Sequence, residues 1–170
     1  HITQRVLQAR GGIPMDRIRV TGNPAWEAFV AAPQLNRAAI RQQLGIGPRH
    51  RFLIYFGDVT ADDPTTLYWV LRHRAPMDRV LFRRHPRDVR DYSQLMADYP
   101  EVFLQAEWTS DALLFCADVC VTHHGAMGLK AALAGIPTIN FILAGDCDEL
   151  CRLCGGFPLS LLGGSSQVCD

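Results

Sequence analysis

The sequence has a single lysine, Lys130, and no excess of charge of either sign. Its 17 Lys and Arg residues are balanced by 17 Asp and Glu residues, so the formal net charge at pH 7 is zero. A protein that binds nucleic acid or an anionic membrane surface through its overall charge normally carries a basic excess. We therefore expect no nucleic-acid partner.

Long apolar runs are also missing. No stretch approaches the roughly 20 residues of a membrane-spanning helix, and no signal peptide opens the chain. Cysteine is absent from the first two-thirds, and Cys116 and Cys120 lie in apolar stretches, where a free thiol behaves as a small hydrophobe. These features favour a reducing, cytoplasmic setting. Because the chain starts with His1, in what reads as the middle of a helix, we expect it to be a fragment of a longer protein.

Short apolar runs alternate with helical patterns along most of the chain. Residues 52–56 are an unbroken apolar run, which is typical of a strand buried on both faces. The expected strands are 52–56, 80–82, 102–104, 118–122 and 138–142, with a further short strand at 17–21. The expected helices are 2–9, 25–31, 36–44, 64–74, 88–99, 110–115 and 126–134. This alternation predicts an α/β fold with a Rossmann-like, doubly wound parallel sheet, whose ligands bind beyond the carboxyl ends of the strands.

Four stretches at or near these strand ends carry a family resemblance. They are 17–29 (RIRVTGNPAWEAF), 41–58 (RQQLGIGPRHRFLIYFGD), 82–88 (FRRHPRD) and 118–142 (DVCVTHHGAMGLKAALAGIPTINFI). In order and spacing they resemble the hinge and C-terminal lobe of GT-B-type glycosyltransferases and the related UDP-N-acetylglucosamine 2-epimerases. The third is similar to the His-Pro segment of CMP- and CDP-using transferases, and the fourth to the unit that holds the donor phosphates.

The resemblance implies a division of the chain. Residues 1–31 would be a remnant of the N-terminal lobe with the interlobe hinge, and residues 32–170 would be the nucleotide-binding C-terminal lobe. The N-terminal lobe that binds the acceptor, including an acceptor at a membrane surface, would be missing, and the fragment is expected to be inactive alone.

The turn at His124, Gly125 and Ala126 lies between a buried strand and a helix. A helix N-terminus offers unpaired N–H groups and partial positive charge, and glycine lets the backbone approach a phosphate closely. By resemblance this turn would bind the donor phosphates. The alternative is an ordinary tight turn in which Gly125 serves packing alone.

His85 follows the expected strand 80–82 and is the predicted catalytic residue. Its imidazole could donate a hydrogen bond to a phosphate oxygen and stabilise a departing nucleotide, and Arg84 beside it would add positive charge. The alternative is that the arginines around Pro86 form an ordinary solvated surface.

Two further loops complete the expected nucleotide site. By resemblance, Gly57 and Asp58 would lie near the sugar and diphosphate, while Trp108 and Thr109 would hold the base, with Trp108 stacked on it. Trp108 could equally be a half-buried loop aromatic. The first loop lacks the His-Arg motif of the epimerases, which argues against an isomerase.

Lys130 is the main departure from the resemblance, because many GT-B enzymes have a glutamate near this point that accepts hydrogen bonds from the ribose. A lysine cannot accept a hydrogen bond, although it could meet a phosphate or extend into solvent.

Cys147, Cys151 and Cys154 match the spacing of an iron–sulfur motif, but the same spacing places them on one face of a helix. We therefore expect neither a metal nor a cofactor.

The leading hypothesis is a nucleotide-sugar-dependent glycosyltransferase, of which this chain would be the half that binds the nucleotide-sugar donor, its substrate. The alternatives are a UDP-N-acetylglucosamine 2-epimerase-like isomerase and a non-catalytic nucleotide-binding module.

Overall fold

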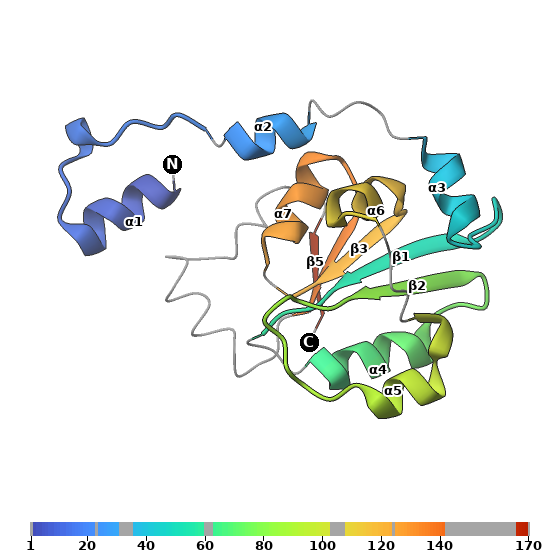
Figure 1. The fold of residues 1–170 in the computed structure, drawn as a ribbon. Helices are drawn as coiled ribbons and strands as arrows, with labels where there is room; N and C mark the ends of the chain where they lie inside the picture. Colours follow the sequence, from blue (N-terminus) through green and yellow to red (C-terminus); the bar gives the residue numbers. More distant parts are fainter. Residues whose placement is uncertain are drawn as a thin grey trace.

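The computed structural model describes residues 2–22, 24–30, 36–59, 63–102, 108–123, 125–141 and 166–169. A parallel five-stranded sheet with the order β2-β1-β3-β4-β5 forms its centre (Figure 1). The strands are β1 (Arg51–Phe56), β2 (Asp78–Arg83), β3 (Val119–Thr122), β4 (Thr138–Phe141) and β5 (Ser166–Cys169). The predicted parallel α/β sheet is therefore confirmed.

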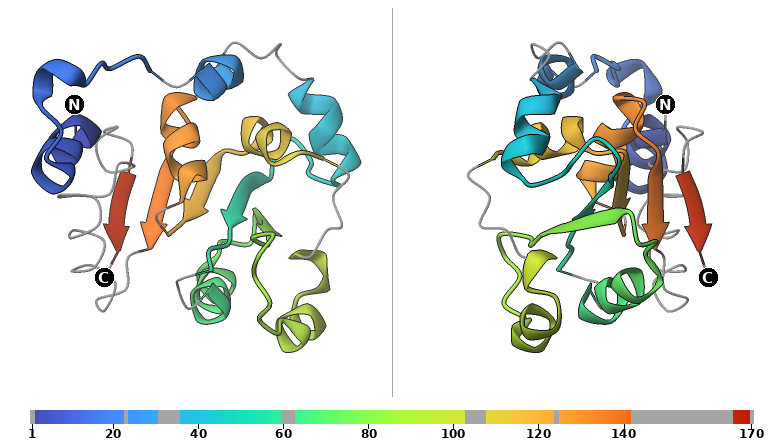
Figure 2. Two further views of the ribbon diagram at one scale, coloured as in Figure 1. Left: turned by 60° about the vertical axis from the view of Figure 1, so that its left-hand side comes forward. Right: turned by 90° about the vertical axis from the view of Figure 1, so that its right-hand side faces the viewer.

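Helices cover both faces of the sheet (Figure 2). The helices of the described residues are α1 (Ile2–Gly11), α2 (Pro24–Val30), α3 (Arg37–Gln43), α4 (Asp63–His73), α5 (Ser93–Asp98), α6 (Ser110–Cys116) and α7 (Ala126–Leu133), with short 3-10 turns at Met15–Arg17 and Pro100–Val102. Helices α3, α6 and α7 lie over one face, and α4 and α5 lie over the other. This arrangement is the doubly wound one expected from the sequence.

The alternation of side chains along the strands builds two cores. Phe52 and Ile54 of β1 point into the core on the α6 and α7 side, whereas Leu53 and Tyr55 point into the core on the α4 side. Five of the six β1 residues are buried, as expected for a central strand with helices on both faces. Gly135, at φ 70°, ends α7 in the left-handed conformation that glycine tolerates best.

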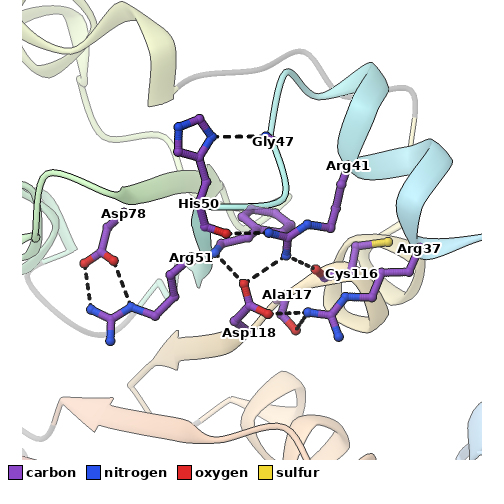
Figure 3. Close-up of polar contacts among 10 residues, drawn as sticks. Arg37, Arg41, Gly47, His50, Arg51, Asp78, Cys116, Ala117 and Asp118 are labelled. Carbon is purple, nitrogen blue, oxygen red and sulfur yellow. Dashed lines mark hydrogen bonds and ion pairs between the residues drawn. The ribbon is translucent and has the colours of Figure 1, made fainter.

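Asp118 connects α3 to the amino ends of β1 and β3 (Figure 3). Its carboxylate accepts hydrogen bonds from the Phe52 N–H at 2.7 Å and from Arg41 Nη1 at 2.8 Å, and Arg37 also donates to it. Burial favours the neutral acid, but the Phe52 N–H and the two arginines outweigh it and hold the pKa of Asp118 below its usual value. These contacts lie at the edge of the sheet opposite to the expected ligand site.

Three expected elements differ in the structure. The strand at 17–21 is wrong: Arg17 ends a 3-10 turn, and Ile18 to Gly22 pair with no strand, so Val20 stays 60% exposed. The helix expected at 88–99 begins only at Ser93. The reason is that Asp88 accepts the Arg90 N–H at 3.0 Å, which makes a turn instead of a helical start.

Two further differences concern the expected strand at 102–104 and the additional strand β5. Val102, expected to begin a strand, ends a 3-10 turn, while residues 103 and 104 lie outside the described residues. Strand β5, which pairs in parallel with β4, is not among the expected strands.

Candidate nucleotide site at the strand ends

The carboxyl ends of β1 and β3 bring Asp58, Thr122 and Gly125 close together. Gly57 follows β1 and donates its N–H to the Arg83 carbonyl at 3.0 Å, which ties it to the end of β2. A Cβ placed on Gly125 would lie 3.8 Å from Asp58 Oδ2 and 3.7 Å from Thr122 Oγ1. Asp58 and Gly125, which are 67 positions apart in the sequence, are thus neighbours at one edge of the sheet.

Helix α7 begins at Ala126 directly after this turn. Gly125 is its N-cap and makes no side-chain capping bond. The N-terminus of α7 therefore faces the strand-end edge, and Gly125 provides no side-chain cap for it. Helix N-termini of this kind can bind anions. His124, predicted to be part of the same turn, lies outside the described residues.

His85 lies in a tight turn after β2. Its Nδ1 accepts the Arg87 N–H at 3.1 Å, and its carbonyl accepts the Asp88 N–H at 2.9 Å. Because Nδ1 is the acceptor, the proton of a neutral ring is on Nε2. Half-buried His85 therefore holds an N–H donor on its outer edge, at the strand next to β1.

Arg90 connects this turn to the Asp58 loop, and no motif in the sequence points to it. Its guanidinium donates to the Asp58 carbonyl and to Asp88 Oδ1, the latter at 2.8 Å. Arg84, a predicted ligand residue, donates to the Arg90 carbonyl at 2.8 Å and lies over the Tyr92 ring. Arg90 thus joins the loops that follow β1 and β2, while Arg84 holds the Arg90 backbone within the segment after β2.

Asp88 fixes the orientation of Arg90. Its side chain is 1% exposed, and it accepts hydrogen bonds from Arg90 Nε and from the Tyr92 hydroxyl at 2.6 Å. Burial, the largest influence, raises the pKa of Asp88, but the bonds from Arg90 and Tyr92 together lower it well below its usual value. Asp88 therefore stays ionised and holds Arg90 in place.

His123 belongs to the interior and not to the ligand surface. It is 1% exposed, with Nδ1 2.9 Å from the Phe141 carbonyl and Nε2 2.8 Å from the Tyr55 hydroxyl. Since a carbonyl can only accept, Nδ1 carries a proton and donates it to the Phe141 carbonyl. This histidine joins β1, β3 and β4 immediately before the Gly125 turn.

No protein-family model and no curated protein matches the chain. Solved structures of the wall teichoic acid polymerase TagF do match it. A histidine-to-asparagine variant soaked with CDPG for 30 minutes aligns with a TM-score of 0.60 at 17% identity, over 95% of this chain and 40% of that one. A histidine-to-alanine variant aligns with a TM-score of 0.57 at 14% identity, over 99% of this chain and 44% of that one. The chain has the fold of a GT-B lobe. It spans less than half of the TagF chains that it matches.

The base-binding residues expected in this GT-B lobe have structural contacts of their own. Thr109 is the N-cap of α6, and its hydroxyl accepts the Ala112 N–H at 3.2 Å. Trp108 is half-buried and packs against the core on the α6 and α7 side. The structure does not place either residue beside Gly125, so base binding by this loop stays a prediction.

Lys130 of the lobe contacts two other helices. Its Nζ lies 2.7 Å from Asp111 Oδ1 of α6 and 5.0 Å from the centre of the Phe29 ring of α2. Phe29 in turn stacks on Phe115 with ring centres 4.6 Å apart. The ammonium group thus has an ion-pair partner in the free chain, and a phosphate contact by Lys130 stays a prediction.

Cys116 and Cys120 are structural cysteines. Both are buried free thiols, and burial raises the pKa of Cys120 to about 12, so the thiol stays protonated. Among the residues that the structure describes, no group of three or more His, Cys, Asp and Glu side chains could hold a metal ion. Cys147, Cys151 and Cys154 lie outside those residues. Within the same part of the chain, no helix combines the length and apolar character that crossing a bilayer requires.

Proposed function

We propose that this chain is the donor-binding lobe of a glycosyltransferase or closely related transferase, and that it binds the nucleotide of a nucleotide-sugar donor at the Gly125 turn. The observation that carries the proposal is the convergence of Asp58, Thr122 and the N-terminus of α7 on one point at the carboxyl edge of a parallel sheet. This edge is where ligands of doubly wound folds bind. The shared fold with a polymerase solved after soaking with CDPG gives further support.

The donor phosphates would be bound mainly by backbone N–H groups. The first N–H groups of α7 have no partner within the helix, and the helix dipole favours an anion at that end. Gly125 has no side chain, so a phosphate can approach the backbone closely. The Asp58 carboxylate repels a phosphate at short range, and it suits the hydroxyl groups of the donor's sugar instead.

His85 would assist departure of the nucleotide. Its Nδ1 is occupied by the Arg87 N–H, so Nε2–H is the atom that can donate to a phosphate oxygen as negative charge develops there. Arg90 bonds the Asp58 carbonyl and Arg84 bonds the Arg90 carbonyl, and both would contribute positive charge to this edge. We assign His85 as the catalytic residue of this lobe.

The acceptor and the general base would be provided by an N-terminal lobe. Residues 1–31 would then be the end of that lobe and the hinge, and the 32–170 lobe alone would bind donor without transferring its sugar. We further propose a cytoplasmic setting, where nucleotide donors and the free thiols of Cys116 and Cys120 are both expected.

A non-catalytic nucleotide-binding module is the second candidate. The observation in its favour is Lys130, a cation near the point where many GT-B enzymes have a glutamate that accepts hydrogen bonds. Its ammonium group forms an ion pair with Asp111. Such a module would bind nucleotides through the Gly125 turn but would support no transfer when joined to its N-terminal lobe.

Calorimetric titration of the chain with UDP, CDP, CMP and GDP tests the proposal. We expect at least one of them to bind with a Kd below about 1 mM, equivalent to about −4 kcal/mol. Absence of binding by all four at millimolar concentration, in this chain and in the longer protein, would contradict the donor-site proposal.

A further inference from the structure

Asn140 in β4 is completely buried, yet its side-chain amide is unpaired. Among the described residues, its Nδ2 and Oδ1 are the only buried side-chain polar atoms without a hydrogen-bond partner. Burying an amide without partners destabilises a fold, and more than nine in ten buried polar groups avoid it. Asparagine is also disfavoured in strands, unlike its neighbours Ile139 and Phe141. Folding alone therefore gives no reason for this residue.

The position of Asn140 links it to the candidate nucleotide site. It pairs in register with Thr122 of β3, so the two side chains lie side by side on one face of the sheet. Helix α7 covers this face, whereas Phe141, the next residue, packs into the core on the opposite face. Thr122 Oγ1 lies 3.7 Å from the point where a Cβ on Gly125 would be. Asn140 is thus one strand away from Thr122, whose hydroxyl lies next to Gly125.

We propose that Asn140 is a donor-recognition residue whose amide gains its hydrogen-bond partners only when a nucleotide-sugar donor occupies the Gly125 turn. This inference rests on the proposed function. A primary amide has two N–H donors and an accepting oxygen. It therefore suits a ligand that presents phosphate oxygens and hydroxyl groups together, which a nucleotide-linked sugar or polyol does. The role is to recognise the donor, not to carry out the chemistry.

The burial of Asn140 adds a condition on how the donor binds. Because the amide has no exposed surface in the free chain, the groups that cover it must move before a ligand can reach it. Donor binding and this movement would then be coupled, as in enzymes whose sites assemble around the substrate.

The substitution Asn140→Leu tests the inference, because it keeps the branched shape of the side chain and removes the amide. We expect the melting temperature to rise by about 2–4 °C, since an unpaired polar group is lost. We expect the affinity for the nucleotide that binds the parent chain to fall fivefold or more. The smaller Asn140→Val serves as a second variant in case leucine is too large for the space.

Thr138→Val is the matched control. Thr138 is two residues earlier in β4, on the same face, but its hydroxyl already donates to the Ile136 carbonyl at 3.0 Å. The control should lower the melting temperature and leave nucleotide affinity unchanged.

Three outcomes would overturn the inference. If both Asn140 variants bind nucleotide as the parent does, the amide plays no part in recognition. If both melt at a lower temperature than the parent, the amide is paired in the folded chain. If the parent itself binds no nucleotide, the proposed function fails and the inference fails with it. This result differs from a loss of nucleotide binding in the Asn140 variants alone.

Discussion

Replacing Gly125 by alanine separates ligand binding from folding at the strand-end turn. Gly125 has a φ of −72°, which any residue adopts, so alanine introduces no backbone strain. The added methyl would meet Thr122 Oγ1 at 3.7 Å and Asp58 Oδ2 at 3.8 Å, which are ordinary contact distances. Folding should therefore tolerate the change, and the loss of glycine's freedom in the unfolded chain stabilises the fold by about 0.4–1 kcal/mol.

Nucleotide binding should respond in the opposite direction. The methyl group occupies the space through which a phosphate would approach the backbone N–H groups of α7. Losing one hydrogen bond to a charged group costs about 1.5–3 kcal/mol, which corresponds to roughly a 10- to 100-fold rise in Kd. Calorimetry with the nucleotide that binds the parent chain measures the change in Kd, and thermal unfolding measures the change in stability.

Gly47→Ala provides the matched control. A Cβ at Gly47 would meet His50 Nδ1 at 3.6 Å, a comparable contact, and the residue lies in the loop before β1, at the other edge of the sheet. It should leave Kd unchanged. If Gly125→Ala bound nucleotide as tightly as the parent while remaining folded, no phosphate would approach the backbone at Gly125, and the reasoning would be refuted.

Three other predictions follow from the contacts. His85→Asn keeps an acceptor for the Arg87 N–H and removes the Nε2 donor, so nucleotide Kd should rise roughly 10-fold or more by calorimetry, in line with one hydrogen bond of about 1.5–3 kcal/mol to a charged phosphate, and an unchanged Kd would remove His85 from the site. The pKa of Asp88 is lower in the folded chain than in the unfolded chain, so the ionised carboxylate stabilises the fold fully above about pH 4, and this stabilisation is lost as the pH falls further. Urea unfolding at pH 7 and pH 3 should therefore show a smaller decrease in the free energy of unfolding for Asp88→Asn than for the parent. Equal decreases would contradict this. Lys130→Met removes a partly exposed ion pair and the contact with the Phe29 ring, so the free energy of unfolding should fall by about 1 kcal/mol; a clear rise in Kd would confirm the predicted phosphate contact of Lys130, and an unchanged Kd would contradict it.

The main strands could be predicted because their signals are local. Residues 52–56 form an apolar run that only a strand with helices on both faces can bury, and the structure places it at the centre of the sheet. Gly135 marks the end of α7 for an equally local reason, since its positive φ favours glycine. The strand expected at 17–21 alternates arginine with Ile18 and Val20, but no described strand lies beside it, and a strand needs a partner for its backbone hydrogen bonds.

The parts of the site that escaped prediction depend on contacts between distant residues. Arg90 matters because it reaches the carbonyl of Asp58, 32 positions away, and a backbone acceptor leaves no mark in the sequence. The unpaired amide of Asn140 is equally invisible, because only the folded chain shows that it is buried. By contrast, the proximity of Asp58 and Gly125 follows from the parallel sheet, in which carboxyl ends share one edge.

The central claim is that an anionic nucleotide binds at the carboxyl ends of β1, β2 and β3. The most direct measurement is an amide-resolved NMR titration of this 18.9 kDa chain with the nucleotide that binds it. We predict that the largest shifts occur at the N–H groups of Gly57, Gly125 and Ala126, and that Arg41 and Asp118 at the opposite edge stay unchanged. Saturable shifts centred on the Asp118 edge, or none at all near Gly125, would contradict the claim.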